Sequence, residues 1–316
     1  MQEFLSRCLN RKNITRGFLF FVLCTVVGLC VGFLWSGTQN FGVVIRSIQG
    51  RFLFLATLCM FSDWLFGAAR LHIFSRKMAP RLTFLDSIRA VLATICVGGI
   101  TPFQTGGVGH IYIYNRVGVP VGGCITTGII SFIGTLMFLF FAAAYVAWQA
   151  PDYLPKGVTL LSRYSLLMFI LALSFFLLMA FKPGIFLIPA TRIRLPNRRG
   201  FHLLTKILNR LAITLDKLIT EHAIFARMFI TDHRGVCILS FIFSAGIYIS
   251  RFVGGYVVVQ ALGGDAPFWH VLAVQSILHF VILFAPSPGA SGFAELLTVV
   301  LMKNLLSTQA LGLYSL

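Results

Sequence analysis

Charged residues are scarce in this sequence: Asp, Glu, Lys and Arg make up 11% of its 316 residues, whereas hydrophobic residues make up 58%. Soluble domains usually carry about 25% charged residues, so the composition excludes an ordinary soluble domain. Acidic residues are fewer still, with 9 Asp and Glu against 26 Lys and Arg, which gives a formal net charge of +17. Such basicity can indicate nucleic-acid binding, but these charges fall in short clusters between apolar runs, as the positive-inside rule requires. We therefore expect no nucleic-acid partner.

Catalytic and metal-binding patterns are also missing. The sequence has no H-E-x-x-H zinc motif, no Gly-x-Gly-Asp motif and no C-x-x-C pair, so its seven cysteines are expected to be small buried hydrophobic residues. Gly289-Ala-Ser-Gly292 fits the Gly-x-Ser-Gly pattern of rhomboid-type proteases, which need a later histidine to activate the serine. No histidine follows His279. We expect no enzyme activity, no metal and no cofactor.

Long uncharged runs are what the sequence does contain. The first extends from Gly17 to Ser36, behind Arg7, Arg11, Lys12 and Arg16. Its 20 residues match the length of a transmembrane helix and exceed a signal-peptide core, so we expect a first helix with its basic end in the cytoplasm. The sequence as a whole predicts an all-α polytopic integral membrane protein with a single transmembrane domain over residues 1–316. The predicted spanning helices are at about 17–37, 52–72, 124–148, 164–181 and 235–262.

Two further apolar runs are interrupted by Pro and Gly. The run Ala90–Asn115 is broken at Thr101-Pro-Phe-Gln-Thr-Gly-Gly107, and the run Phe268–Ala294 is broken at Pro286-Ser-Pro-Gly-Ala-Ser-Gly-Phe-Ala-Glu295. The pieces on either side of each break are too short to span a bilayer. Each run therefore predicts a re-entrant helical hairpin, the first entering from the cytoplasm and the second from outside. Irregular backbone at bilayer depth must be surrounded by protein or line a cavity, so the two breaks are expected to meet inside the bundle.

The order of these elements predicts an inverted repeat, with half one at about 15–150 and half two at about 160–316. Each element of the second half crosses the membrane in the opposite direction to its counterpart, as in many transporters. Residues 149–163 are weakly charged and are expected to form an outer loop. The repeat needs a closing helix, and two alternatives remain open: one continuous helix over Glu295–Leu316, or a chain that ends short of the full repeat.

The most basic segment, at about 190–234, is expected to be a cytoplasmic linker between the halves. Within it, apolar residues recur at helical spacing from Leu204 to Phe225, with most charged residues elsewhere around the helix. This pattern predicts an amphipathic helix lying on anionic lipid head groups. A solvated helix that links two bundles is the alternative.

The two breaks also carry the candidate binding chemistry. Helix ends inside a membrane present unpaired N–H groups and partial positive charge, which suits a phosphate or carboxylate. Arg70 and Arg251 could add fixed positive charge, and Glu295 could pair with Arg251, bind a coupling proton or receive a cationic head group. Asp63 and Arg70 are seven residues apart and share a helix face, where a structural ion pair is a further alternative. Close helix packing is the other explanation for the glycines. The predicted substrate-binding residues are Arg70, Thr101, Pro102, Thr105, Gly106, Gly107, Arg251, Pro286, Pro288, Gly289, Ser291, Gly292 and Glu295.

At these residues the sequence resembles the flippase-like transmembrane domain of lysylphosphatidylglycerol synthases and their stand-alone relatives. The resemblance is carried by Thr101-Pro-Phe-x-Thr-Gly-Gly107 with the following His110–Pro120, by Arg70, by Ala261-Leu-Gly263 and by Pro286-x-Pro-Gly-x-x-Gly-x-x-Glu295. It covers about residues 15–300. Two departures stand out: Ala290 replaces a second glycine, and the C-terminus is short.

The resemblance implies a lipid-translocase-like core that moves or accommodates a phospholipid or a polyprenyl-linked lipid. It does not imply lysyl transfer, because the synthases perform that step in a separate soluble domain. We expect an inner-membrane protein with a cytoplasmic N-terminus that binds a membrane lipid with an anionic head group. The alternative is a non-transporting membrane subunit that supports a lipid-modifying enzyme as its partner.

Overall fold

The computed structural model describes residues 49–101, 106–149, 156–183, 202–283 and 287–303. It also describes the short stretches 15–16, 18–20, 22–23, 25–27 and 305–307, and single residues 30, 185, 285, 310, 311 and 314. Three predicted site residues, Pro102, Thr105 and Pro286, lie outside the described residues, as does much of the predicted first helix.

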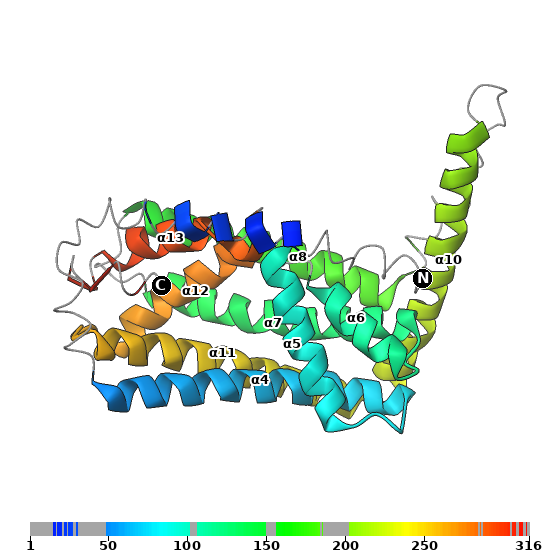
Figure 1. The fold of residues 1–316 in the computed structure, drawn as a ribbon, viewed down its shortest axis with the longest axis horizontal. Helices are drawn as coiled ribbons and strands as arrows, with labels where there is room; N and C mark the ends of the chain where they lie inside the picture. Colours follow the sequence, from blue (N-terminus) through cyan, green and yellow to red (C-terminus); the bar gives the residue numbers. More distant parts are fainter. Residues whose placement is uncertain are drawn as a thin grey trace.

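Every element of the described residues is helical, which confirms the predicted all-α class (Figure 1). Three of these helices are long and apolar enough to cross a bilayer: Gly50–Met78, Val121–Tyr145 and Arg234–Ala261. That either hairpin enters and leaves the same membrane face remains a prediction. The elements are α4 (Gly50–Met78), α5 (Phe84–Ile100), α6 (Gly107–Arg116), α7 (Val121–Gln149), α8 (Lys156–Phe181), α10 (His202–Thr231), α11 (Arg234–Ala261), α12 (Phe268–Leu283), the 3₁₀ turn η2 (Pro288–Ala290) and α13 (Phe293–Met302).

Helices α4 and α11 pack side by side along nearly their whole lengths (Figure 1). Small residues permit the close approach: a Cβ at Gly246 would lie 3.0 Å from the Phe66 ring, and one at Gly254 would lie 3.3 Å from Cys59. Between these contacts the Ser250 hydroxyl donates to the Ser62 hydroxyl at 3.1 Å. Because the contacts advance along α4 while they retreat along α11, the helices are antiparallel. The end of α4 therefore lies beside the start of α11.

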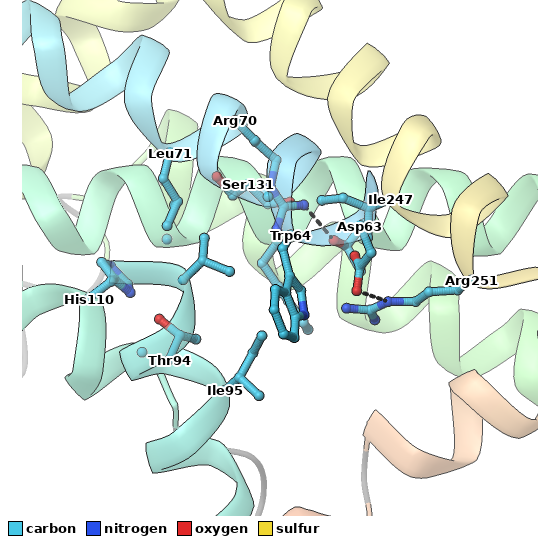
Figure 2. Close-up of a pocket in the computed structure, with 16 residues that line it drawn as sticks. Asp63, Trp64, Arg70, Leu71, Thr94, Ile95, His110, Ser131, Ile247 and Arg251 are labelled. Carbon is cyan, nitrogen blue, oxygen red and sulfur yellow. Dashed lines mark hydrogen bonds and ion pairs between the residues drawn. The ribbon is translucent and has the colours of Figure 1, made fainter. Parts of the chain in front are cut away.

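Helices α5 and α6 form a hairpin in which α5 packs against α4 and α6 packs against α7, and both line the cavity of Figure 2. The two arms touch backbone to backbone at glycines. A Cβ at Gly109 would lie 2.5 Å from the Ala93 carbonyl oxygen, and one at Gly106 would overlap the Thr94 carbonyl. Gly106 therefore serves close helix packing, which the sequence analysis gave as the other explanation for the glycines.

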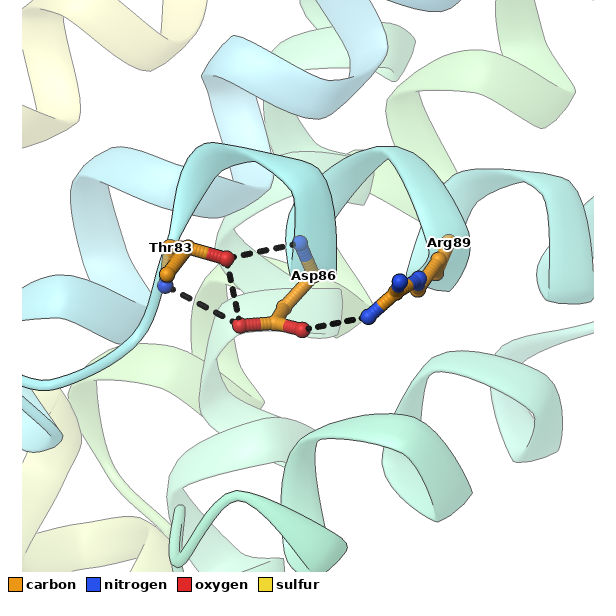
Figure 3. Close-up of polar contacts among 3 residues, drawn as sticks. All are labelled: Thr83, Asp86 and Arg89. Carbon is orange, nitrogen blue, oxygen red and sulfur yellow. Dashed lines mark hydrogen bonds and ion pairs between the residues drawn. The ribbon is translucent and has the colours of Figure 1, made fainter.

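Helix α5 begins six residues before the predicted start at Ala90, because Thr83 and Asp86 form a capping box (Figure 3). The Thr83 hydroxyl and backbone N–H both donate to Asp86 Oδ2, at 2.7 and 3.1 Å, and the Asp86 N–H donates back to the Thr83 hydroxyl at 3.3 Å. Arg89 Nη1 lies 3.3 Å from Asp86 Oδ1. These interactions satisfy N–H groups that the first turn leaves free and place a negative charge at the helix N-terminus.

The second break is built around backbone with positive φ. The φ angles of Gly289, Ala290 and Gly292 are 59°, 59° and 79°. Ala290 thus occupies a left-handed conformation, in which an alanine is strained and a glycine would not be. The replacement of the second glycine by Ala290 therefore costs backbone strain. The turn η2 contacts α5, so the second break lies against the first hairpin.

Helix α10 projects from the end of the bundle at which α4 ends and α11 begins (Figure 1). Its last turns are fixed to the bundle by two side chains. Glu221 Oε2 accepts from the Gly122 N–H in the first turn of α7 at 3.1 Å. His222 joins Thr126 Oγ1 of α7, at 2.8 Å, to the Met179 carbonyl of α8, at 3.1 Å. A negative side chain at the α7 N-terminus is stabilising, so Glu221 docks α10 through a helix dipole.

One predicted boundary is wrong, and one of the two alternatives left open for the closing helix is excluded. The expected outer loop at 149–163 is helical from Lys156 onward. Helix α8 begins with a weakly charged segment that precedes its apolar part. The continuous closing helix over Glu295–Leu316 is not formed, since α13 ends at Met302 and a turn follows in which the N–H groups of Leu305 and Leu306 both donate to the Met302 carbonyl.

We expect glycine-to-alanine changes at two open positions to have opposite effects on stability. Gly118 has φ +99° and Gly235 is helical, and a Cβ meets nothing within 4 Å at either position. Gly118→Ala should lower the free energy of unfolding by about 1–2 kcal/mol, because an L side chain strains that backbone. Gly235→Ala should raise it by up to about 1 kcal/mol, since alanine favours the helix. Thermal unfolding in detergent measures both, and a stabilised Gly118→Ala variant would contradict the assigned backbone.

We expect the capping box to make stability depend on pH. Hydrogen bonds from the Thr83 side chain and backbone hold the pKa of Asp86 below its usual value. The box therefore contributes stability above the unfolded pKa of about 3.9 and loses it as the pH falls through the lower, folded pKa. Thr83→Ala should lower the free energy of unfolding by about 1 kcal/mol at pH 7, and by less in acid.

The control for this change is Thr220→Ala, which removes an exposed hydroxyl that donates only to the Asp216 carbonyl within α10. Thermal unfolding of both variants at neutral and acidic pH measures the difference. A Thr83→Ala deficit that stayed constant with pH would show that the Asp86 charge takes no part.

Candidate functional site

A cavity of about 270 Å³ lies inside the bundle where α4, α5, α6, α7 and α11 meet (Figure 2). Charged side chains enter it from α4 and α11, while α5 and α6 contribute small or apolar residues and one histidine. The lining residues are Asp63, Trp64, Gly67, Arg70, Leu71, Val91, Thr94, Ile95, Gly107, His110, Gly128, Ser131, Phe132, Thr135, Ile247 and Arg251.

Arg70 is the central cation of this cavity. Its Nη1 donates to the Thr135 hydroxyl at 3.1 Å, the Ser244 hydroxyl at 3.0 Å and the Ser131 carbonyl at 3.3 Å. Its Nε is buried and has no hydrogen-bond partner. Among the described residues, no carboxylate forms an ion pair with Arg70. The guanidinium is therefore held in place by neutral oxygens, and its charge is not neutralised by contact.

Asp63 and Arg251 form an ion pair at one side of the same cavity (Figure 2). Arg251 Nε donates to Asp63 Oδ2 at 3.2 Å, and its guanidinium lies over the Tyr248 ring at 5.3 Å. The Arg251 side chain keeps 39% of its surface exposed and that of Asp63 keeps 17%. Glu295, the partner considered for Arg251 at the sequence level, does not form this contact. Asp63 and Arg70 line one cavity from one helix face, as their spacing predicts.

His110 lines the cavity but is not among the predicted substrate-binding residues. It lies one turn after Gly107 in α6, and its Nε2 is 3.2 Å from the Cys124 carbonyl oxygen of α7. Because a carbonyl only accepts, Nε2 carries the proton in this contact. The signal that could have found His110 is its position three residues after the predicted site residue Gly107. Within the described residues, no group of three His, Cys, Asp or Glu side chains could hold a metal ion.

The structure divides the predicted site residues into two sets. Arg70, Gly107 and Arg251 line the cavity. Thr101 does not, and its hydroxyl donates to the Val97 carbonyl one turn earlier in α5, at 2.7 Å. The residues of the second break that the structure describes, 287–295, are also absent from the cavity lining.

The second break forms a separate polar cluster beside α5. Ser291 is buried, and its hydroxyl lies 2.7 Å from the Thr25 hydroxyl. The Ser287 hydroxyl and Glu295 Oε2 are buried without a hydrogen-bond partner in the described part of the chain. Pro288 is buried, and Gly289 and Gly292 supply the positive φ angles of the turn. The cluster therefore has unused acceptor capacity close to the first hairpin.

Comparison with known proteins relates these features to one family. The sequence model described as "Lysylphosphatidylglycerol synthase TM region" matches residues 18–316. A UPF0104 membrane protein from Archaeoglobus fulgidus is 21% identical over 293 residues, a match that covers 92% of this chain and 88% of that protein. No solved structure matches the chain. Because the family match extends over nearly the whole sequence, the chain belongs to the family of the lysylphosphatidylglycerol synthase transmembrane region.

Proposed function

We propose that this chain is a flippase-like protein of the cell inner membrane. It translocates or binds a phospholipid or a polyprenyl-linked lipid by holding the head group in the central cavity. The observation that carries the proposal is Arg70, a cation that lines the cavity and has no carboxylate in contact among the described residues.

The energetics of Arg70 favour an anionic ligand. Moving an unpaired charge out of water costs several kcal/mol, and three contacts with neutral oxygens offset only part of this. A phosphate would supply the missing negative charge and an acceptor for the buried Nε. Guanidinium and phosphate also match geometrically, since two N–H groups can bind two oxygens. An anionic head group would thus be more favourable in this cavity than a neutral one.

The size of the cavity favours a head group over a whole lipid. Cavities that enclose small ligands usually measure about 300–1,000 Å³, and this one measures about 270 Å³. A phosphate with a short polar substituent fits that volume, whereas acyl or polyprenyl chains do not. The chains would stay in the surrounding bilayer while the head group crosses the protein.

The ion pair between Asp63 and Arg251 would act with Arg70 in head-group binding. A phosphate placed between the two arginines competes with Asp63 for Arg251. Once released, Asp63 can accept from an ammonium group on the same lipid. The cavity would therefore accommodate anionic lipids and lipids that carry an additional amine.

The second break completes the proposed path. Its turn η2 (Pro288–Ala290), which contains Gly289, contacts α5, the helix that also lines the cavity, and Ser291, Gly292 and Glu295 follow directly. The partnerless Oε2 of Glu295 makes this carboxyl our candidate for a coupling proton or for a cationic head group. Movement of the second break relative to α5 would open the cavity to one side of the membrane.

The proposed orientation follows from the basic residues at one end of the bundle. Arg76 and Lys77 end α4, Arg116 ends α6 and Arg234 begins α11, at the end where α10 projects (Figure 1). By the positive-inside rule this end faces the cytoplasm. Since α4 then begins outside, a preceding helix over 17–37 puts the N-terminus in the cytoplasm.

We expect Arg70→Met to abolish most lipid flipping without destabilising the protein. Replacing a buried charge that lacks a counter-ion by an apolar side chain is often neutral or stabilising. The loss of a charge-assisted contact with a phosphate should slow flipping by about 10- to 100-fold. The assay is dithionite quenching of a fluorescent phosphatidylglycerol in liposomes that contain the purified protein.

The control for this prediction is Arg227→Gln, which changes an exposed arginine of α10. It should flip lipid at the wild-type rate. A stable Arg70→Met variant with full flipping would refute the assigned site. A wild-type protein that binds the lipid but does not flip it would favour the non-transporting subunit.

We expect Arg251 to be coupled energetically to Asp63 and not to Glu295. In a double-mutant cycle of Arg251→Ala and Asp63→Asn, the two changes should interact by about 1 kcal/mol, since the pair is only partly exposed. The cycle of Arg251→Ala and Glu295→Gln should be additive. Thermal unfolding in detergent provides both cycles, and the reverse result would mean that Arg251 exchanges its partner in the membrane.

A further inference from the structure

A second cavity, of about 500 Å³, lies between α4 and α11 at the end of the pair from which α10 projects, and it is separate from the central one. The antiparallel register places the last turn of α4 beside the first turn of α11, and this pocket lies between them. Its lining residues are His72, Ile73, Arg76, Lys77, Pro80, Gly235, Val236 and Leu239. The pocket combines basic side chains from α4 with a helix start from α11.

The charges of this pocket are all of one sign. Arg76 and Lys77 are exposed, and neither forms an ion pair with a carboxylate among the described residues. Asp232 is the nearest acidic residue in sequence to the pocket wall, and its Oδ1 accepts from the Thr231 hydroxyl. It does not line the pocket.

The start of α11 adds donors to these charges. Its N-cap residue, His233, makes no side-chain capping bond, so the first turn lacks the usual side-chain acceptor. Gly235 presents its backbone without a side chain, and nothing lies within 4 Å of where its Cβ would be. A helix start with exposed backbone beside two cations is suited to a phosphate.

The remaining wall of the pocket is apolar and continues toward the lipid. Ile73, Val236 and Leu239 line it. Next to Leu239, the outward face of α11 carries Ile238 and Ile242, which are 64% and 55% exposed. A molecule with its phosphate on the basic residues would thus have an apolar surface along which its chains could extend into the bilayer.

We propose that this pocket binds one anionic phospholipid of the cytoplasmic leaflet as a resident lipid. The phosphate contacts Arg76, Lys77 and the start of α11, and an acyl chain lies along Leu239 and Ile242. Basic pockets between transmembrane helices on the cytoplasmic side commonly hold lipid head groups in this way. The site is independent of the central cavity and does not depend on lipid transport.

The test is native mass spectrometry of the purified protein in mixed micelles that contain phosphatidylglycerol or phosphatidylcholine. The wild type should bind phosphatidylglycerol in preference, and the double variant Arg76→Gln/Lys77→Gln should bind one such lipid about 25-fold more weakly, since each basic residue contributes roughly a factor of five. The matched control Arg81→Gln/Arg227→Gln removes two exposed arginines outside the pocket and should bind as the wild type does.

Two further variants separate this proposal from folding defects and from the central cavity. Gly235→Phe keeps every charge, favours the helix and fills the pocket, so it should remain folded and lose the same lipid. Arg70→Met should leave this lipid in place, whatever it does to flipping. The proposal is overturned if the double variant and its control Arg81→Gln/Arg227→Gln weaken lipid binding equally. It is also overturned if Gly235→Phe binds phosphatidylglycerol as the wild type does. Displacement of the lipid by excess inorganic phosphate alone would instead identify a site for free phosphate.

Discussion

The close antiparallel packing of α4 against α11 is the contact on which both candidate binding sites depend. It rests on small residues: Gly246 receives the Phe66 ring, and Gly254 lies against Cys59. In lipid the hydrophobic effect does not hold helices together, so close packing of this kind must do so. The register brings Asp63 to Arg251 in the middle of the bundle and Arg76 to Gly235 at the end from which α10 projects. A shift of α4 by one turn along α11 would separate Asp63 from Arg251 and Arg76 from Gly235.

The shortage of acidic residues then determines the character of each site. Asp63 is paired with Arg251, while Arg70 is surrounded by hydroxyl and carbonyl oxygens of α7 and α11. Neutral oxygens orient a guanidinium but do not cancel its positive charge, so its electrostatic potential can still attract an anionic ligand. The same holds at the second cavity, where Arg76 and Lys77 lie beside the start of α11. In the described part of the chain, the shortage of carboxylates thus leaves cations without a contacting counter-ion at both places.

The glycines show how one residue type serves different purposes at neighbouring positions. Gly106 and Gly109 let α5 and α6 touch through their backbones, Gly107 faces the cavity, and Gly118 and Gly292 provide positive φ. In the sequence Gly106, Gly107 and Gly292 all appear only as parts of the two Pro/Gly breaks. Close packing and ligand access both require the absence of a side chain, so the pattern alone cannot tell one from the other.

The sequence by itself determined the membrane class, the helical elements and both Pro/Gly breaks, because hydropathy and helix length depend on local composition. It placed Arg70, Gly107 and Arg251 among the site residues, since cations and broken helices in apolar runs are locally visible. It did not include His110 among the site residues, offered Glu295 and not Asp63 as the partner of Arg251, and began α5 late, at Ala90 instead of after the Thr83 cap. Only the tertiary structure decided which charges meet, because partners such as Asp63 and Arg251 lie 188 residues apart and are joined by helix register alone.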